Sequence, residues 1–130
     1  APANILVRYR YDAGIAAAVR RRLSQATPAA WSSFTKLAAD MRMPPSTLRH
    51  RLHHEGQSYA AIKDDIRRDL AVDLLLNTPK TIGEIAVQLG YSEPSAFFRA
   101  FRKWMDKSPE TFRREEALSQ LDEPSESRAL

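Results

Sequence analysis

The stretch TIGEIAVQLGYSEPSAFFRAFRKW, residues 81–104, decides how the chain folds. Thr81 followed three residues later by Glu84 is the pattern of a capping box, which predicts the start of a helix. Gly90 can adopt the positive φ that ends such a helix, and Ser92 can cap a second one. Between these signals the apolar residues recur at helical spacing, as a buried stripe made of Ile82, Ile85, Ala86 and Leu89.

The second helix of this stretch begins within about three residues of the first, with Pro94 in its first turn. One face of this helix is apolar and consists of Phe97, Phe101 and Trp104. The opposite face is polar and basic and consists of Ser95, Arg99 and Arg102. Two short helices joined by a glycine turn are typical of a helix-turn-helix, whose second helix can enter a major groove of DNA. The alternative is an ordinary helical hairpin with a solvated basic face.

The same pattern occurs earlier in the chain. Ser32 or Ser33 can cap a helix, and Pro44-Pro45 starts the next one, which runs to Gly56. At an offset of 48 residues, Phe34, Leu37, Ala38 and Met41 match Ile82, Ile85, Ala86 and Leu89; at 49, Leu48 and Leu52 match Phe97 and Phe101. The outer faces pair Ser46 with Ser95, His50 with Arg99, and His53 with Arg102. The repeat predicts two helix-turn-helix units, with one extra residue in the second turn.

The flanking segments are also predicted to be helical, which gives an all-α fold of about seven helices with two helix-turn-helix subdomains joined by a long linking helix. One helix begins near Ala13 with Arg20, Arg21 and Arg22 exposed, and the last runs from Ser108-Pro109 to about Leu118. The strand-like alternation at residues 5–11 is interpreted as part of a linker. The predicted parts are a linker-like segment at 1–12, a first unit at 13–57, a linking helix at 58–78, a second unit at 79–117, and an acidic, disordered tail at 118–130.

The composition favours a cytoplasmic protein that binds a polyanion. The chain has 130 residues, of which 43% are hydrophobic, so it can bury one core or two small ones. It contains no cysteine, no apolar run as long as a membrane span, and no signal-peptide layout at its start. Residues 1–114 carry a net charge of +8 and residues 115–130 one of −4. A basic body of this kind attracts nucleic acid, although charge alone does not distinguish DNA from RNA or an anionic membrane.

The motifs of the second unit resemble those of a known family. They are Ile82-Gly-Glu-Ile-Ala-x-x-Leu-Gly-Tyr-Ser, Phe97-x-Arg-x-Phe101, and Ser108-Pro109 followed by Phe112-Arg113. With the two units and the long helix between them, residues from about 13 to 117 resemble the DNA-binding domain of the AraC/XylS family of bacterial transcription regulators. The resemblance implies a monomeric module that lays two recognition helices into successive major grooves of double-stranded DNA. It also implies RNA polymerase as a partner, a separate effector or dimerisation domain upstream, no cofactor, and association with the nucleoid.

The resemblance also assigns roles to individual residues. The base-reading positions are Ser46, Arg49 and His50 in the first unit, and Pro94, Ser95, Ala96 and Arg99 in the second. The expected phosphate contacts are His53, Arg102 and Lys103. Three residues depart from the family pattern: Arg42 replaces the turn glycine, Pro44 replaces a capping serine, and Phe98 stands where a smaller or polar residue is usual. The first two could each cost about 1 kcal/mol, and Phe98 is either extra packing or a contact to a thymine methyl group.

Other functions have less support in the sequence. Zinc could in principle be bound by His50, His53 and His54, but no cysteine or carboxylate joins them at a recognisable spacing. The aspartates at 65, 69 and 73 lie at helical spacing, which is typical of a solvated face. No nucleophile motif or phosphate loop supports an enzyme. A helical module that docks a protein partner remains the alternative, and it should carry exposed leucine or aromatic anchors on its outer faces.

Overall fold

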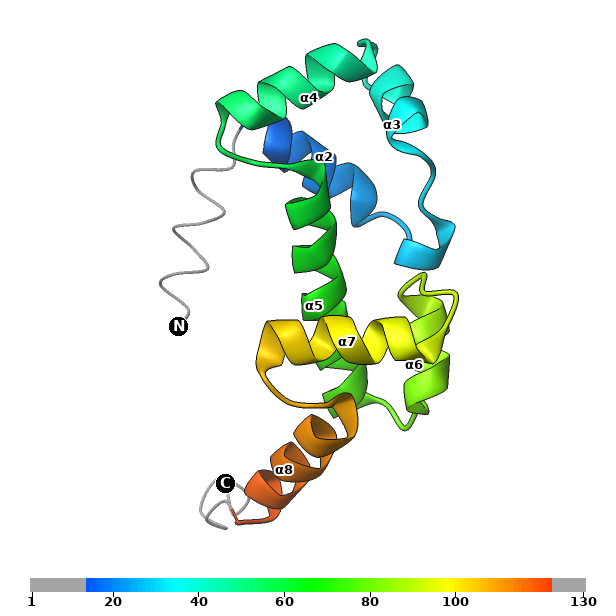
Figure 1. Cartoon of the computed structure of the whole chain (residues 1–130), viewed down its shortest axis with the longest axis vertical. Helices are drawn as coiled ribbons and strands as arrows, with labels where there is room; N and C mark the ends of the chain where they lie inside the picture. The colour runs from blue at the N-terminus through cyan, green and yellow to red at the C-terminus, as the bar shows by residue number, and fades with distance from the viewer. Residues whose placement is uncertain (1–13, 123–130) are drawn as a thin grey trace, which may run out of the picture. The chain divides into compact units, whose positions relative to one another are not determined.

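The computed structural model describes residues 14–122, which form seven α-helices and one 3-10 helix and contain no strand (Figure 1). The elements are α2 (Ile15–Leu23), η1 (Pro28–Ala30), α3 (Phe34–Asp40), α4 (Pro45–His54), α5 (Tyr59–Asn77), α6 (Ile82–Gln88), α7 (Pro94–Met105) and α8 (Pro109–Asp122). The prediction of an all-α fold with two helix-turn-helix pairs is therefore confirmed. The strand-like pattern at residues 5–11 lies outside the described residues.

The chain divides into two compact units, and the division between Arg67 and Arg68 falls within α5. The first unit contains the pair α3 and α4, and the second contains the pair α6 and α7. The long helix α5 begins where the sequence predicts, because the Ser58 hydroxyl accepts a hydrogen bond from the Ala61 amide at 3.1 Å. Each unit has its own hydrophobic core.

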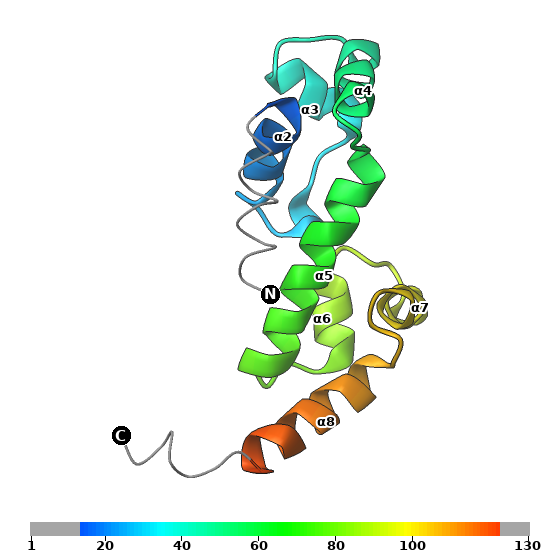
Figure 2. The same cartoon turned by 90° about the vertical axis from the view of Figure 1, so that its left-hand side faces the viewer.

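The core of the first unit lies among α2, α3, α4 and the start of α5, and Figure 2 shows α2 beside α3 and α4. Its buried residues are Ala16, Val19, Leu23, Leu37, Ala38, Leu48, Leu52 and Ile62. Trp31 packs against this core, and its indole N–H donates to the Leu23 carbonyl at 2.8 Å. Arg20 was expected to be exposed, but it is half-buried and forms an ion pair with Asp65 at 3.2 Å. The prediction of a fully solvated aspartate face on α5 is therefore wrong at Asp65.

The N-terminus of α2 is held by a side chain from the end of α4. The carboxylate oxygens of Glu55 accept hydrogen bonds from the amides of Ile15 and Ala16, at 2.9 and 3.1 Å. A Cβ atom on Gly14 would lie 2.3 Å from Glu55 Oε2, so glycine permits this close approach. Glu55 supplies the cap that α2 lacks in its own sequence, and it links the N-terminus of α2 to the C-terminal end of α4.

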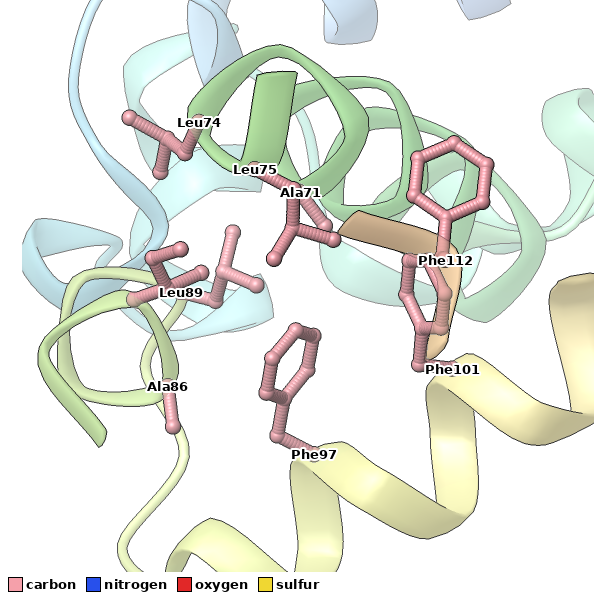
Figure 3. Packing of buried hydrophobic residues seen from close by; sticks show 9 residues of the cluster. Ala71, Leu74, Leu75, Ala86, Leu89, Phe97, Phe101 and Phe112 are labelled. Atoms are coloured by element: carbon pink, nitrogen blue, oxygen red, sulfur yellow. The ribbon is translucent and has the colours of Figure 1, made fainter. Parts of the chain in front are cut away.

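The core of the second unit is rich in aromatic side chains. Figure 3 shows Phe97 and Phe101 pointing from α7 toward buried residues of α5 and α6, and Phe112 reaching them from α8. Phe101 lies edge-on to both neighbours, with ring centroids 5.8 Å from Phe97 and 5.4 Å from Phe112. Phe98 is half-buried and packs against this core, which supports the packing interpretation of that residue. Trp104 also packs there, as the sequence predicts, and so does Met105.

Arg113 on α8 closes the C-terminal end of α5. Its guanidinium donates to the carbonyls of Leu75 at 2.9 Å and Lys80 at 2.7 Å, with longer bonds to Leu74 at 3.3 Å and Thr78 at 3.2 Å. One side chain thus satisfies carbonyls that the end of a helix leaves unpaired. The helix that carries Arg113 continues to Asp122, so residues 118–122, expected to be part of a disordered tail, are helical instead.

Candidate nucleic-acid interface

The turns of the two helix-turn-helix pairs have the same backbone structure. In the first, Arg42 has a positive φ of 62°, and the Met43 amide donates to the Ala38 carbonyl at 3.0 Å. In the second, Gly90 has a φ of 89°, and the Tyr91 amide donates to the Ala86 carbonyl at 3.0 Å. The 48-residue repeat therefore extends to the hydrogen bonds of the turn. Arg42 occupies a glycine-type conformation, as its position in the repeat predicts.

The turns differ in how they lead into the second helix. They span residues 41–44 and 89–93, so the extra residue predicted in the second turn is present. Pro44 is the N-cap of α4, and Glu93 is the N-cap of α7; neither side chain bonds the helix N-terminus. The prediction that Ser92 caps α7 is wrong, because Pro94 takes the first helical position and the cap must directly precede it. Uncapped amides at a helix N-terminus can bind a phosphate.

Each second helix presents one polar or basic face to solvent. On α4 the exposed side chains of this face are Ser46, His50 and His53, and on α7 they are Ser95, Arg99 and Arg102. Lys103 and Pro94 are also exposed, and Ala96 is partly exposed. The opposite sides of the helices are buried in the two cores. The structure therefore brings the candidate residues of each unit together on one face of its own helix.

Arg49 lies at the edge of this face of α4, beside an aromatic ring. Its guanidinium carbon is 5.1 Å from the centre of the Phe34 ring, which in turn packs on Tyr59 with 4.8 Å between centroids. Beside these residues an open cleft of about 340 Å³ extends to Leu52 and His53. Sequence reasoning treated Phe34 only as a core residue and missed this contact, because the two residues come from different helices and share no local pattern.

The face of α4 and the face of α7 contain no acidic side chain. The sequences of both helices, PSTLRHRLHH and PSAFFRAFRKWM, lack aspartate and glutamate. Two further basic residues are exposed, Arg51 on α4 and Arg22 at the end of α2, of which the sequence predicted only the exposure of Arg22. A helix face of this kind offers hydrogen-bond donors and positive charge, which suit base edges and phosphates.

Residues 14–122 form neither a metal site nor a membrane-spanning helix. His50, His53 and His54 are exposed on α4, and no group of three His, Cys, Asp or Glu side chains between residues 14 and 122 is arranged to hold a metal ion. In the same part of the chain, no helix has both the length and the apolar character needed to cross a membrane.

Comparison with known proteins gives consistent matches. The sequence profile of a helix-turn-helix domain family, of the AraC type, matches residues 37–115. The uncharacterized HTH-type transcriptional regulator Rv1395 of Mycobacterium tuberculosis is 39% identical over 101 residues, which are 78% of this chain and 29% of that protein. The chain therefore spans less than a third of the length of this relative.

Two solved structures have a similar fold. The transcriptional regulator CdpR of Pseudomonas aeruginosa matches with a TM-score of 0.72 and 31% identity, over 78% of this chain and 32% of that one. The DNA-binding domain of the transcriptional factor AdpA, solved in complex with a target DNA, matches with a TM-score of 0.68 and 21% identity, over 84% of this chain and 95% of that domain. At that identity the second match concerns the fold alone.

Proposed function

Since the chain belongs to the AraC-type family of helix-turn-helix domains, we propose that it is the DNA-reading domain of a sequence-specific transcription regulator. In this proposal α4 and α7 are the recognition helices, and they enter successive major grooves of double-stranded DNA. The domain consists of the two units expected at residues 13–57 and 79–117, joined by the helix at 58–78. Its action is binding, with no catalytic step and no cofactor.

One observation carries this proposal: the same exposed, acid-free face recurs on the second helix of both units. A module that docks a protein partner should instead present apolar anchors there. The large hydrophobic residues that are exposed between residues 14 and 122 are Val87, Leu118 and Leu121, and none of them lies on α4 or α7. The arrangement of side chains therefore favours DNA over a protein partner.

We assign the two recognition helices unequal shares of the sequence information. In the first unit, Ser46, Arg49 and His50 can each form hydrogen bonds with base edges. In the second, only Ser95 and Arg99 can do so, because Pro94 and Ala96 have no side-chain donor or acceptor. The side chains of His53, Arg102 and Lys103, which lie on the same helices, are assigned to phosphates. The first half of the site should therefore show the stronger base preference.

The remaining partners follow from the family. The chain spans only 29% of the length of its relative Rv1395, so we propose that an effector or dimerisation domain precedes this segment in the full-length protein. We also propose RNA polymerase as a partner, and a cytoplasmic location in association with the nucleoid. The full-length protein would then combine an effector or dimerisation domain with this DNA-binding domain.

A salt titration of DNA binding tests the proposal. Fluorescence anisotropy of a labelled duplex should show binding as a monomer that weakens steeply with added salt. About six phosphate contacts give a slope of log K against log salt near −5. A matched control is the double variant Arg102→Ala/Lys103→Ala, which should flatten the slope by about 2. Salt-independent binding, or no binding to any duplex, would contradict the proposed function.

A further inference from the structure

Four side chains in the first unit form a row in which cations flank two aromatic rings. The Arg49 guanidinium lies 5.1 Å from the centre of the Phe34 ring, and Phe34 packs on Tyr59 at 4.8 Å with an interplanar angle of 54°. At the other end, the Lys63 ammonium lies 4.6 Å from the centre of the Tyr59 ring. The row joins the recognition helix α4 to α3 and α5. In this row the neighbour of Arg49 is Phe34, which lies at the margin of the core of the first unit.

The internal repeat shows that the fold does not require this row. At the offsets of 48 and 49 residues, Phe34 corresponds to Ile82 and Arg49 corresponds to Phe98. Both residues of the second unit are apolar, and both pack against its core. The same position on the recognition helix therefore serves packing in one unit and carries a cation over a ring in the other. Phe34 also packs against the core of its unit, so the first unit differs from the second in the Arg49 cation that lies over this ring.

The contact with this ring bears on the rotamers that the Arg49 side chain can adopt. An exposed arginine samples many rotamers, and ordering it for a bidentate contact with a base costs conformational entropy. No carboxylate between residues 14 and 122 is within ion-pair distance of Arg49, so Phe34 is the neighbour that limits its rotamers. An arginine held in one direction pays less of this entropy when it binds a base.

We propose that Phe34, supported by Tyr59, is a positioning residue for Arg49 and thereby sets the base preference of the first unit. The ring does not touch DNA in this account; it holds the guanidinium at the edge of α4, where the base is read. The proposal rests on the proposed function, because it assigns a specificity role within that same DNA interface. A cation over an exposed ring is stabilised enough to change an equilibrium about two- to fivefold.

A double-mutant cycle tests the proposal with the full chain. Phe34→Leu keeps the apolar contact with the core and removes the ring, Tyr59→Phe keeps both rings, and Arg49→Ala removes the cation. Each variant is measured on a duplex selected by the wild-type chain and on a scrambled duplex at one salt concentration. Phe34→Leu should lower the selected-to-scrambled ratio about two- to fivefold at the base pair that Arg49→Ala relaxes. It should have no further effect on this ratio in the Arg49→Ala background, and Tyr59→Phe should resemble the wild type.

Two outcomes would overturn the assignment. Equal losses on both duplexes would give Phe34 a purely structural role, and independent effects of Phe34→Leu and Arg49→Ala on the ratio would show that the ring does not act through the cation. A wild-type chain with no base preference would instead contradict the proposed function. The positioning claim is then decided without DNA, by nuclear magnetic resonance. The Arg49 Cδ protons should be shifted upfield by the Phe34 ring and lose that shift in Phe34→Leu; equal shifts in both proteins would refute it.

Discussion

Replacing Arg113 by methionine should destabilise the second unit by about 3 kcal/mol. Methionine keeps an unbranched apolar stem and removes all the donors that close the end of α5. The two short bonds, to Leu75 at 2.9 Å and to Lys80 at 2.7 Å, carry most of the effect. A hydrogen bond from a charged donor contributes about 1.5 kcal/mol at the lower end of its range, and two of them give the expected loss. The two longer bonds, at 3.3 and 3.2 Å, are weaker and are not counted in this loss.

Urea unfolding followed by fluorescence measures this effect in the unit concerned. A Trp31→Phe background leaves Trp104 as the reporter, because Trp104 packs against the core of the second unit. The midpoint should fall without a change of slope, which shows that stability and not compactness has changed. Arg114→Met is the matched control, since Arg114 is exposed on the same helix and should cost less than about 0.5 kcal/mol. An Arg113→Met loss no larger than that of the control would refute the capping role.

Three further predictions concern the turn, the helix cap and the DNA contacts. Arg42→Gly should raise stability by up to about 1 kcal/mol, because Arg42 has a positive φ of 62° that glycine adopts without strain; a loss in urea unfolding would contradict this. Hydrogen bonds with Thr81 lower the pKa of the Glu84 carboxyl below its ordinary 4.5, so its stabilising contribution is present above that pH and lost as the pH falls through the lowered pKa. The melting temperature of Glu84→Gln should therefore fall less steeply than that of the wild type as the pH is lowered below 4.5, and parallel curves would exclude the linkage. Arg99→Ala should relax one base pair in the second half of the DNA site, whereas Arg102→Ala should weaken selected and scrambled duplexes alike; binding assays with the reverse pattern would exchange the two roles.

Signals between residues close in the sequence predicted much of the fold. The capping box is present as expected, with the Thr81 amide bonded to Glu84 Oε1 at 2.8 Å and the Glu84 amide to Thr81 Oγ1 at 3.1 Å. Ser33 caps α3 by accepting a bond from the Lys36 amide, which decides between the two candidate serines. The error at Ser92 was also local, because a proline at the first helical position already places the cap one residue before it. Such signals suffice for elements and turns.

Contacts between distant residues could not be predicted in the same way. The ion pair of Arg20 with Asp65 joins side chains 45 residues apart, and nothing in either local sequence distinguishes them from solvated charges. The same holds for the caps that Glu55 and Arg113 provide to other helices. For the interface, the repeat placed the exposed faces of α4 and α7, but it did not indicate that the Phe34 ring lies beside Arg49. Which residues read bases and which contact phosphates stays a prediction.

Selection of bound duplexes from a random pool tests the central claim most directly. The wild-type chain is incubated with the pool at one salt concentration, and the bound duplexes are sequenced over several rounds. If α4 and α7 both read DNA, the enriched sequences should contain two blocks of base preference centred about one helical turn apart, and Arg49→Ala should relax the preference at one base pair of the stronger block. A pool that shows no enrichment, or a single block that the Arg49→Ala and Arg99→Ala variants leave unchanged, would contradict the account.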